Sequence, residues 1–217
     1  MNKSALYATL AMLPVLAYAP LTNAAHDAVE PTSKVIKLDK PLQVGDKMIN
    51  FELDNPAGGK VSLDKMLAEG PVVLTFFRGS WCPYCIDELD DVQSRLKKIE
   101  DAGGNIFAIS PETAEKTTEF IEKKKLAFTF GTDHDNALAK QLALAFRLDP
   151  KTIKAYRNYG IDVPESNDTK RWELPIPATY VIDTDHTIHY AFVDEDYSKR
   201  ANYDKVIEVL KELQEDD

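Results

Sequence analysis

The chain has 217 residues, of which 44% are hydrophobic and 29% are charged, a balance that suits one compact soluble domain. Its formal net charge is −10, so it repels the phosphates of nucleic acids and the headgroups of anionic lipids. This charge excludes nucleic acid as an expected partner.

The first residues have the three parts of a secretory signal peptide. Lys3 supplies the positive charge, an apolar run covers residues 5–19, and small residues follow around Ala24. The run is short and interrupted by Pro14, so it suits a membrane span poorly. We predict that residues 1–24 are a cleaved signal peptide and that the mature protein is exported to the periplasm without stable membrane insertion. An uncleaved anchor is the alternative.

The chain after the leader divides into a linker and one domain. Residues 25–41 carry few apolar side chains and are predicted to be the linker, whereas residues 42–217 alternate strand and helix patterns. This alternation predicts an α/β protein of thioredoxin-like fold, with a central mixed β-sheet flanked by helices on both faces. The expected strands are residues 51–53, 60–62, 72–77, 106–109, 128–130, 178–183 and 188–193, and the expected helices are 63–67, 82–103, 110–125, 137–145 and 206–213.

One long segment, residues 149–175, is polar and is expected to be irregular. It contains Tyr156, Tyr159 and Trp172, which either cover a reactive site as a lid or pack against the sheet.

The chemistry is expected from Cys82 and Cys85, the two cysteines of the chain. Two cysteines this close cannot form the disulfide framework of a small secreted domain. They follow a buried strand and begin a helix, where free N–H groups stabilise a thiolate. We assign Cys82 as the exposed attacking thiol and Cys85 as the more buried resolving thiol. A zinc site lacks further cysteine ligands, and a structural disulfide is the other alternative.

Three neighbouring side chains are candidates to assist the cysteines. Trp81 covers the sulfur and leaves one edge open for substrate. Arg78 either lowers a thiol pKa or extends its charge to water. Glu88 lies one helical turn beyond Cys85, where it either relays a proton or is simply solvated.

The segment Trp-Cys-Pro-Tyr-Cys resembles the active site of thioredoxin-fold oxidoreductases. The surrounding chain is similar to the alkyl hydroperoxide reductase/thiol-specific antioxidant family, and in particular to its peroxiredoxin-like branch with a Cys-x-x-Cys motif. The matching stretches are residues 44–46, 70–85, 109–113, 175–183 and 192–200.

The chain departs from the peroxiredoxin pattern at the positions that carry peroxide chemistry. The family has Pro-x-x-x-Thr-x-x-Cys, but here Arg78 takes the Pro place, Cys82 the Thr place and Cys85 the Cys place. The family arginine is replaced by Pro177. The resemblance implies that Pro177 is a cis-proline facing the dithiol, with Ile176 beside it as a substrate-binding residue and Pro175 as a rival candidate.

These departures favour an exported thiol–disulfide oxidoreductase as the leading prediction. Cys82 attacks a protein or small-molecule disulfide and Cys85 resolves the mixed disulfide, with no organic cofactor or metal required. The resemblance implies a reducing thioredoxin-like donor. The alternative is a thioredoxin-dependent peroxidase that reduces hydroperoxides. A non-catalytic binding module is a third possibility, which the intact cysteine pair disfavours.

Overall fold

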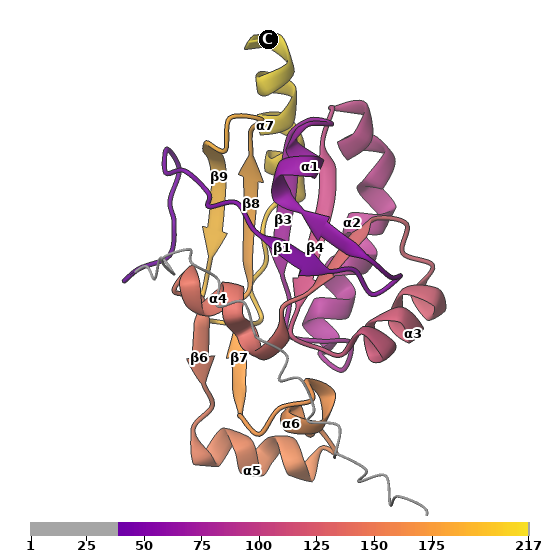
Figure 1. Ribbon diagram of the computed structural model, residues 1–217, viewed down its shortest axis with the longest axis vertical. Coiled ribbons are helices and arrows are strands. Elements are labelled where there is room, and N and C mark those ends of the chain that lie inside the picture. Colours follow the sequence, from indigo (N-terminus) through magenta and orange to yellow (C-terminus); the bar gives the residue numbers. More distant parts are fainter. Residues whose placement is uncertain (1–38, 217) are drawn as a thin grey trace, which may run out of the picture. The chain divides into compact units, whose positions relative to one another are not determined.

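The computed structural model describes residues 39–216 (Figure 1). The predicted signal peptide, residues 1–24, lies outside this range, as does all but the end of the predicted linker, residues 25–41. None of the helices within the described range is long and apolar enough to cross a bilayer.

A seven-stranded mixed sheet forms the centre of the fold. Its strand order is β2-β1-β5-β4-β3-β8-β9. In the middle of the sheet β3, β4 and β5 run parallel, whereas β8 runs antiparallel to both β3 and β9. The predicted mixed sheet is therefore confirmed. The strands are β1 (Glu52–Asp54), β2 (Lys60–Ser62), β3 (Val72–Phe76), β4 (Asn105–Ser110), β5 (Thr129–Thr132), β8 (Ala178–Ile182) and β9 (Ile188–Val193).

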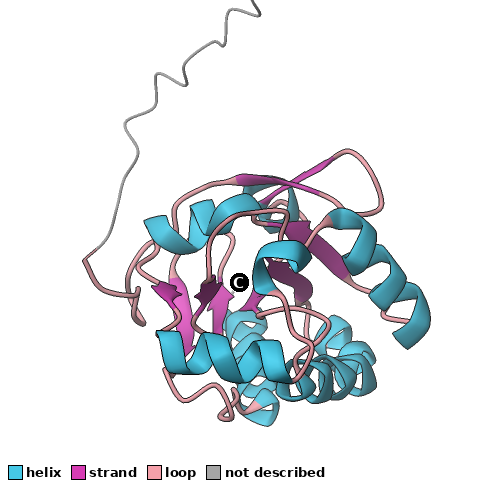
Figure 2. Ribbon diagram, turned by 90° about the horizontal axis from the view of Figure 1, so that it is seen from below, coloured by secondary structure: helices cyan, strands magenta, loops and turns pink. Residues whose placement is uncertain are grey.

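Helices cover both faces of this sheet (Figure 2). All five residues of β3 are buried, and successive side chains point to opposite faces. Leu74 joins a core with side chains of α1 and α4, whereas Val73 joins a second core with side chains of α2 and α7. The main helices are α1 (Leu63–Leu67), α2 (Pro83–Asp101), α3 (Ala114–Lys124), α4 (Ala137–Gln141) and α7 (Tyr203–Asp216).

Helix α2 begins where the sequence predicts. Its N-cap is Cys82 and its first residue is Pro83, which loses no helical hydrogen bond at that position. Leu89, Val92 and Ile99 recur at helical spacing and are buried, so one face of α2 is fixed against the sheet. The start of the helix is thereby held beside the end of β3.

The predicted start of the next helix is wrong. Ser110 is not its N-cap, because Ser110 continues β4 and pairs with Thr132 of β5. Helix α3 begins at Ala114 instead, capped by the Thr113 hydroxyl, which accepts from the Lys116 amide.

The helix expected over residues 137–145 is shorter than predicted. Helix α4 ends at Gln141, and Ala143 adopts a left-handed backbone with φ of 56°. That turn redirects the chain into strand β6 (Ala145–Arg147), so the last residues of the expected helix belong to another element.

The segment predicted to be irregular is instead ordered, and β6 leads into it. It contains α5 (Pro150–Asn158), α6 (Val163–Ser166) and β7 (Glu173–Pro175), and β7 pairs with β6 as a separate two-stranded sheet. We call residues 145–175 the cap segment. Its elements are too short to give a clear hydrophobic period, which is why the pattern reads as irregular.

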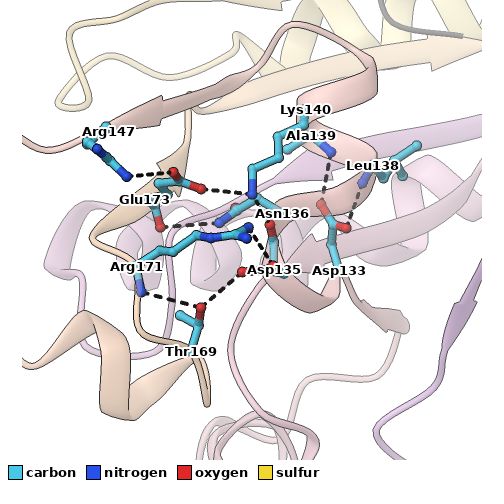
Figure 3. A network of polar contacts seen from close by, with 10 residues as sticks. All are labelled: Asp133, Asp135, Asn136, Leu138, Ala139, Lys140, Arg147, Thr169, Arg171 and Glu173. Atoms are coloured by element: carbon cyan, nitrogen blue, oxygen red, sulfur yellow. Dashed lines mark hydrogen bonds and ion pairs between the residues drawn. The ribbon is translucent and has the colours of Figure 1, made fainter. Parts of the chain in front are cut away.

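A polar network joins the cap segment to the main domain (Figure 3). Buried Asp133 accepts from the amides of Leu138 and Ala139 at 2.8 and 2.9 Å and so caps α4. On the other side, Asn136 Nδ2 donates to the Glu173 carbonyl at 3.2 Å, and Lys140 Nζ lies 2.8 Å from the Glu173 carboxylate. The network anchors β7 beside α4.

Candidate active site

A tight loop carries the chain from β3 to the cysteines. Gly79 has φ of 147°, and a Cβ at this position would lie 2.5 Å from Nε1 of Trp81, so only glycine fits without displacing the indole. Ser80 is held by the buried Glu112, whose carboxylate accepts from the Ser80 amide at 2.7 Å and from its hydroxyl at 3.0 Å. Trp81, packed against Gly79, and Glu112, bonded to Ser80, therefore hold the loop in this conformation.

Both cysteines are free thiols at the start of α2, and both are buried. Cys82 is 0% exposed and Cys85 is 1% exposed. The expectation that Cys82 is the exposed thiol is therefore wrong. The physical reason is that Cys82 packs in a hydrophobic cluster with Phe77 and Leu89, against which Trp81 also packs.

The Arg78 guanidinium contacts Cys82 directly. Arg78 Nη2 donates to Cys82 Sγ at 3.0 Å, while Nη1 donates to the hydroxyl of Tyr156 on α5 at 2.7 Å. The guanidinium also stacks 4.0 Å from the ring centre of Tyr197. Arg78 is only 3% exposed, so its charge turns toward the sulfur and not toward water.

These contacts give Cys82 the reactive form of a thiol. Hydrogen bonding from the Cys85 thiol and the charge and hydrogen bond of Arg78 outweigh burial and lower the pKa of Cys82 to about 5. Burial alone would lower the pKa of Arg78, but the Cys82 thiolate raises it. Cys82 is therefore a thiolate at neutral pH.

Cys85 has the opposite protonation. Burial raises the pKa of Cys85 well above its ordinary value, and the neighbouring Cys82 raises it further. Its sulfur accepts weakly from the Arg78 amide at 3.5 Å and from Nη2 of Arg200 at 3.5 Å. Cys85 is thus a protonated thiol beside a thiolate, the pair of states that a resolving and an attacking cysteine need.

Glu88 lies behind Cys85 and is not a solvated surface residue. Its side chain is 3% exposed, and its carboxylate lies 2.8 Å from Nε of Arg200 and 3.3 Å from the Tyr203 hydroxyl. Burial raises the pKa of Glu88 to about 7, against the charge of Arg200. A carboxylate with this pKa can take up or release a proton near the sulfurs.

A pocket opens beside Arg78, and Cys82 itself does not line it. It has a volume of about 340 Å³ and is lined by residues that include Arg78, Trp81, Tyr84 and Tyr197. A small oxidant could approach the buried sulfur through this aromatic mouth.

The three aromatic residues of the predicted lid have different places. Tyr156 accepts a hydrogen bond from Arg78, which itself contacts Cys82, and packs edge-on against Trp81. Tyr159 is 80% exposed, and Trp172 packs in the small core of the cap segment beneath Arg157. Of the three, only Tyr156 hydrogen-bonds to Arg78 in the described structure, although Tyr159 also lines the pocket next to Arg78.

The two residues predicted beside the dithiol from the neighbouring strand are placed differently. The Ile176–Pro177 bond is trans, like the other peptide bonds within residues 39–216, so the expected cis-proline is wrong. An X–Pro bond prefers trans unless its surroundings force the cis form. Pro177 precedes β8, next to the pairing of Ala178 with Phe76 at the end of β3. Ile176 lines another pocket with Phe146, so the structure does not bring it to the sulfurs.

Sequence reasoning missed the residues that come from distant segments. Arg200 lies 115 positions from Cys85 and reaches it from the turn before α7. Arg200 is the last residue of the stretch 192–200 that matches the family, and this match was the one feature of the sequence that could have pointed to it. Tyr203 has no such signal, because its hydroxyl matters only once α7 packs on α2.

Comparisons with known proteins identify the family of the chain. The model of the AhpC/TSA family matches residues 44–191, more than half of the chain. The chain is 24% identical over 172 residues to peroxiredoxin Bcp of Escherichia coli K12, covering 79% of this chain and 97% of that protein. It is 26% identical over 212 residues to chloroplastic peroxiredoxin Q of Oryza sativa subsp. japonica, covering 98% and 82%.

Solved structures agree in fold. The peroxidoxin BcpB of Mycobacterium tuberculosis superimposes with a TM-score of 0.64 at 22% identity, covering 79% of this chain and 98% of that one. Peroxiredoxin Q of Xanthomonas campestris gives 0.57 at 20% identity, with 75% and 90% covered. With the family model, these likenesses make the chain an oxidoreductase of thioredoxin-like fold that belongs to the AhpC/TSA family.

Proposed function

We propose that the chain is a thiol peroxidase in which Cys82 attacks a hydroperoxide and Cys85 resolves the product. The observation that carries the proposal is the buried Arg78 guanidinium, 3.0 Å from the Cys82 sulfur. The similarity to peroxiredoxin Bcp and peroxiredoxin Q supports peroxide reduction, although the family pattern has its attacking cysteine at the position of Cys85 and not of Cys82.

The reaction proceeds in two steps. The Cys82 thiolate attacks one peroxide oxygen, the O–O bond breaks, and the leaving oxygen takes a proton to become an alcohol or water. Cys82 is then a sulfenic acid, and the sulfur of Cys85 attacks it with loss of water to form the disulfide. An external dithiol, which we infer to be a thioredoxin-like protein, reduces the disulfide and is itself oxidised.

Arg78 supplies a hydrogen-bond donor for the peroxide, which this chain lacks at the positions where the family has its threonine and arginine. The threonine and arginine that polarise peroxide are replaced here by Cys82 and Pro177. The guanidinium of Arg78 can stabilise both the thiolate and the negative charge that develops on the leaving oxygen. Donors placed for such charge typically contribute on the order of 10²–10³ in rate.

The burial of the sulfurs favours a small oxidant. With 0% and 1% exposure, neither sulfur can meet a protein disulfide unless the covering side chains move. A hydroperoxide is small enough for the pocket beside Arg78, whose volume is about 340 Å³.

Thiol–disulfide exchange remains the second candidate. The depressed pKa of Cys82, about 5, with a protonated partner thiol beside it also suits attack on a disulfide. Stopped-flow oxidation of the reduced protein by a hydroperoxide and by a small disulfide, at equal concentration, separates the two. We expect the hydroperoxide to react faster, and the reverse order would establish disulfide exchange as the main activity.

Export to the periplasm is a separate proposal that rests on residues 1–24 alone. Mass spectrometry of the exported fraction should find a mature chain that begins near Ala25. Recovery of only the full-length chain would support the uncleaved anchor.

A further inference from the structure

The position of Arg78 needs an explanation, because a buried guanidinium on a long side chain does not hold itself in place. Within residues 39–216 no carboxylate forms an ion pair with Arg78, although several other arginines have one. Its Nε atom is buried and lacks a hydrogen-bond partner in the same range. Arg78 is therefore held by something other than an acidic side chain.

The Tyr156 hydroxyl is the neutral group that meets the guanidinium. It accepts from Nη1 at 2.7 Å, while Nη2 of the same planar group donates to Cys82 Sγ at 3.0 Å. Because the guanidinium is a rigid fork, a contact that fixes Nη1 also fixes the direction in which Nη2 points. The Tyr156 contact therefore aims the other nitrogen at the sulfur.

Tyr156 is positioned for this contact by the cap segment. Its ring packs edge-on against Trp81 at 5.6 Å and joins the small core around Leu148, Val163 and Leu174. The residue thus comes from α5, which is separate in sequence from both Arg78 and the cysteines.

We propose that Tyr156 is a positioning residue whose hydroxyl holds Arg78 against the Cys82 thiolate. The cap segment then controls the reactivity of a cysteine that it does not itself supply. The inference rests on the proposed function only in taking Cys82 as the attacking thiol.

Other groups near the sulfurs also affect the titration of Cys82 and must stay constant in the test. These groups are the side chain at position 85, which is serine in every variant compared, the Glu88 carboxyl with its Arg200 partner, and the Tyr197 ring stacked on Arg78. A hydroxyl deletion at Tyr156 changes none of them chemically.

The test measures the thiolate of Cys82 alone. In a Cys85→Ser parent, the rate of iodoacetamide alkylation is followed against pH, with thiolate absorbance near 240 nm as a second readout. Tyr156→Phe removes the hydroxyl and keeps the ring, and should raise the titration midpoint by about one pH unit. Tyr159→Phe, an exposed tyrosine at the end of the same helix, is the matched control and should leave the midpoint unchanged.

A double-mutant cycle separates positioning from packing. In an Arg78→Met parent, Tyr156→Phe should produce no further shift, because the group that it positions is gone. An equal shift in both parents would overturn the inference. So would an unchanged midpoint in Tyr156→Phe together with a raised one in Tyr156→Ala, since that result assigns the effect to the ring.

The same series distinguishes failure of the inference from failure of the proposed function. If both the reduced wild type, followed by thiolate absorbance, and the Cys85→Ser parent titrate near the ordinary thiol value of ~8.5, Cys82 is not the activated nucleophile and the proposed function fails with it. If the parent titrates low and Tyr156→Phe changes nothing, only the inference fails.

Discussion

The two sulfurs lie three residues apart, and each has an arginine, yet their surroundings differ in one decisive respect. Arg200, which contacts Cys85, is paired with the buried Glu88 carboxylate, whereas Arg78, which contacts Cys82, has no ion pair with a carboxylate within the described residues. Arg200 divides its contacts with side chains between the Glu88 carboxyl and the Cys85 sulfur, whereas the hydrogen bonds of the Arg78 guanidinium in the described residues go only to Cys82 and the neutral Tyr156 hydroxyl. We infer from this difference that Arg78, which has no carboxylate partner in the described residues, favours the thiolate form of Cys82 over that of Cys85.

The largest effect is expected from replacing each cysteine in turn, which tests whether Cys82 and not Cys85 attacks the hydroperoxide. Cys82→Ser should lower the rate of oxidation by hydroperoxide on the order of 10⁴-fold or more, because it removes the thiolate. Cys85→Ser should keep the first oxidation step and stop at the sulfenic acid, which a dimedone adduct in mass spectrometry detects. If Cys85→Ser were the inactive variant and Cys82→Ser the active one, the assignment would be reversed.

The next test exchanges the two arginines for uncharged residues of similar length. Arg78→Met should slow oxidation of Cys82 by roughly 10²–10³-fold, the range for a lost charge-stabilising donor. Arg200→Met should slow it less, because Arg200 serves Cys85 and Glu88. Stopped-flow rates at several peroxide concentrations measure both, and equal losses would contradict the distinction between the two arginines.

The surroundings of Cys85 can be tested through Glu88, whose titration should make the free energy of unfolding depend on pH. Its folded pKa of about 7 lies above its ordinary value of 4.5, so the folded state binds a proton that the unfolded state has released. The stabilisation from that proton is present below about pH 4.5 and is lost as the pH rises through about 7.

The matched variant is Glu88→Gln, which cannot titrate. Relative to it, the wild type should lose about 3 kcal/mol of unfolding free energy between pH 4.5 and pH 7.5. Urea unfolding at several pH values gives the difference. If the unfolding free energy of the wild type instead rises relative to that of Glu88→Gln as the pH increases, Arg200 keeps Glu88 ionised over this range.

Tyr197 should give the smallest effect. Its ring stacks on Arg78 at 4.0 Å, but the residue is 44% exposed, and such a contact is worth about 0.5–1 kcal/mol. Tyr197→Leu should therefore slow oxidation of Cys82 by roughly two- to five-fold. A loss as large as that of Arg78→Met would show that the stacking, and not the hydrogen bonds, holds the guanidinium.

Local sequence patterns were enough to predict the central sheet and the helix that begins at the cysteines. Buried strands such as β3 consist of consecutive apolar residues, and Pro83 marks the first turn of α2. The cap segment was not predictable in this way, because its elements are short and its core depends on contacts with Trp81. The exposure of Cys82 was misjudged because its cluster includes Phe120 and Phe130, which are distant from it in the sequence.

The residues around the sulfurs also differ in whether the sequence could predict them. Arg78 lies four residues from Cys82, so the sequence could suggest their contact. Arg200 and Tyr203 reach the site only through the packing of the last strand and helix. Periodicity and spacing carry no information about such contacts, and the resemblance indicated only the stretch that ends at Arg200.

Arg78 occupies the position where the family pattern has proline, and this one replacement affects both cysteines. Where peroxiredoxins carry proline, this chain has a residue with a backbone N–H, which points at Cys85, and a side chain that reaches Cys82. A single replacement thus touches both members of the redox pair, one through the main chain and one through the side chain. Returning position 78 to proline would remove both contacts together, so the hydrogen bonds to the two sulfurs depend on the same residue.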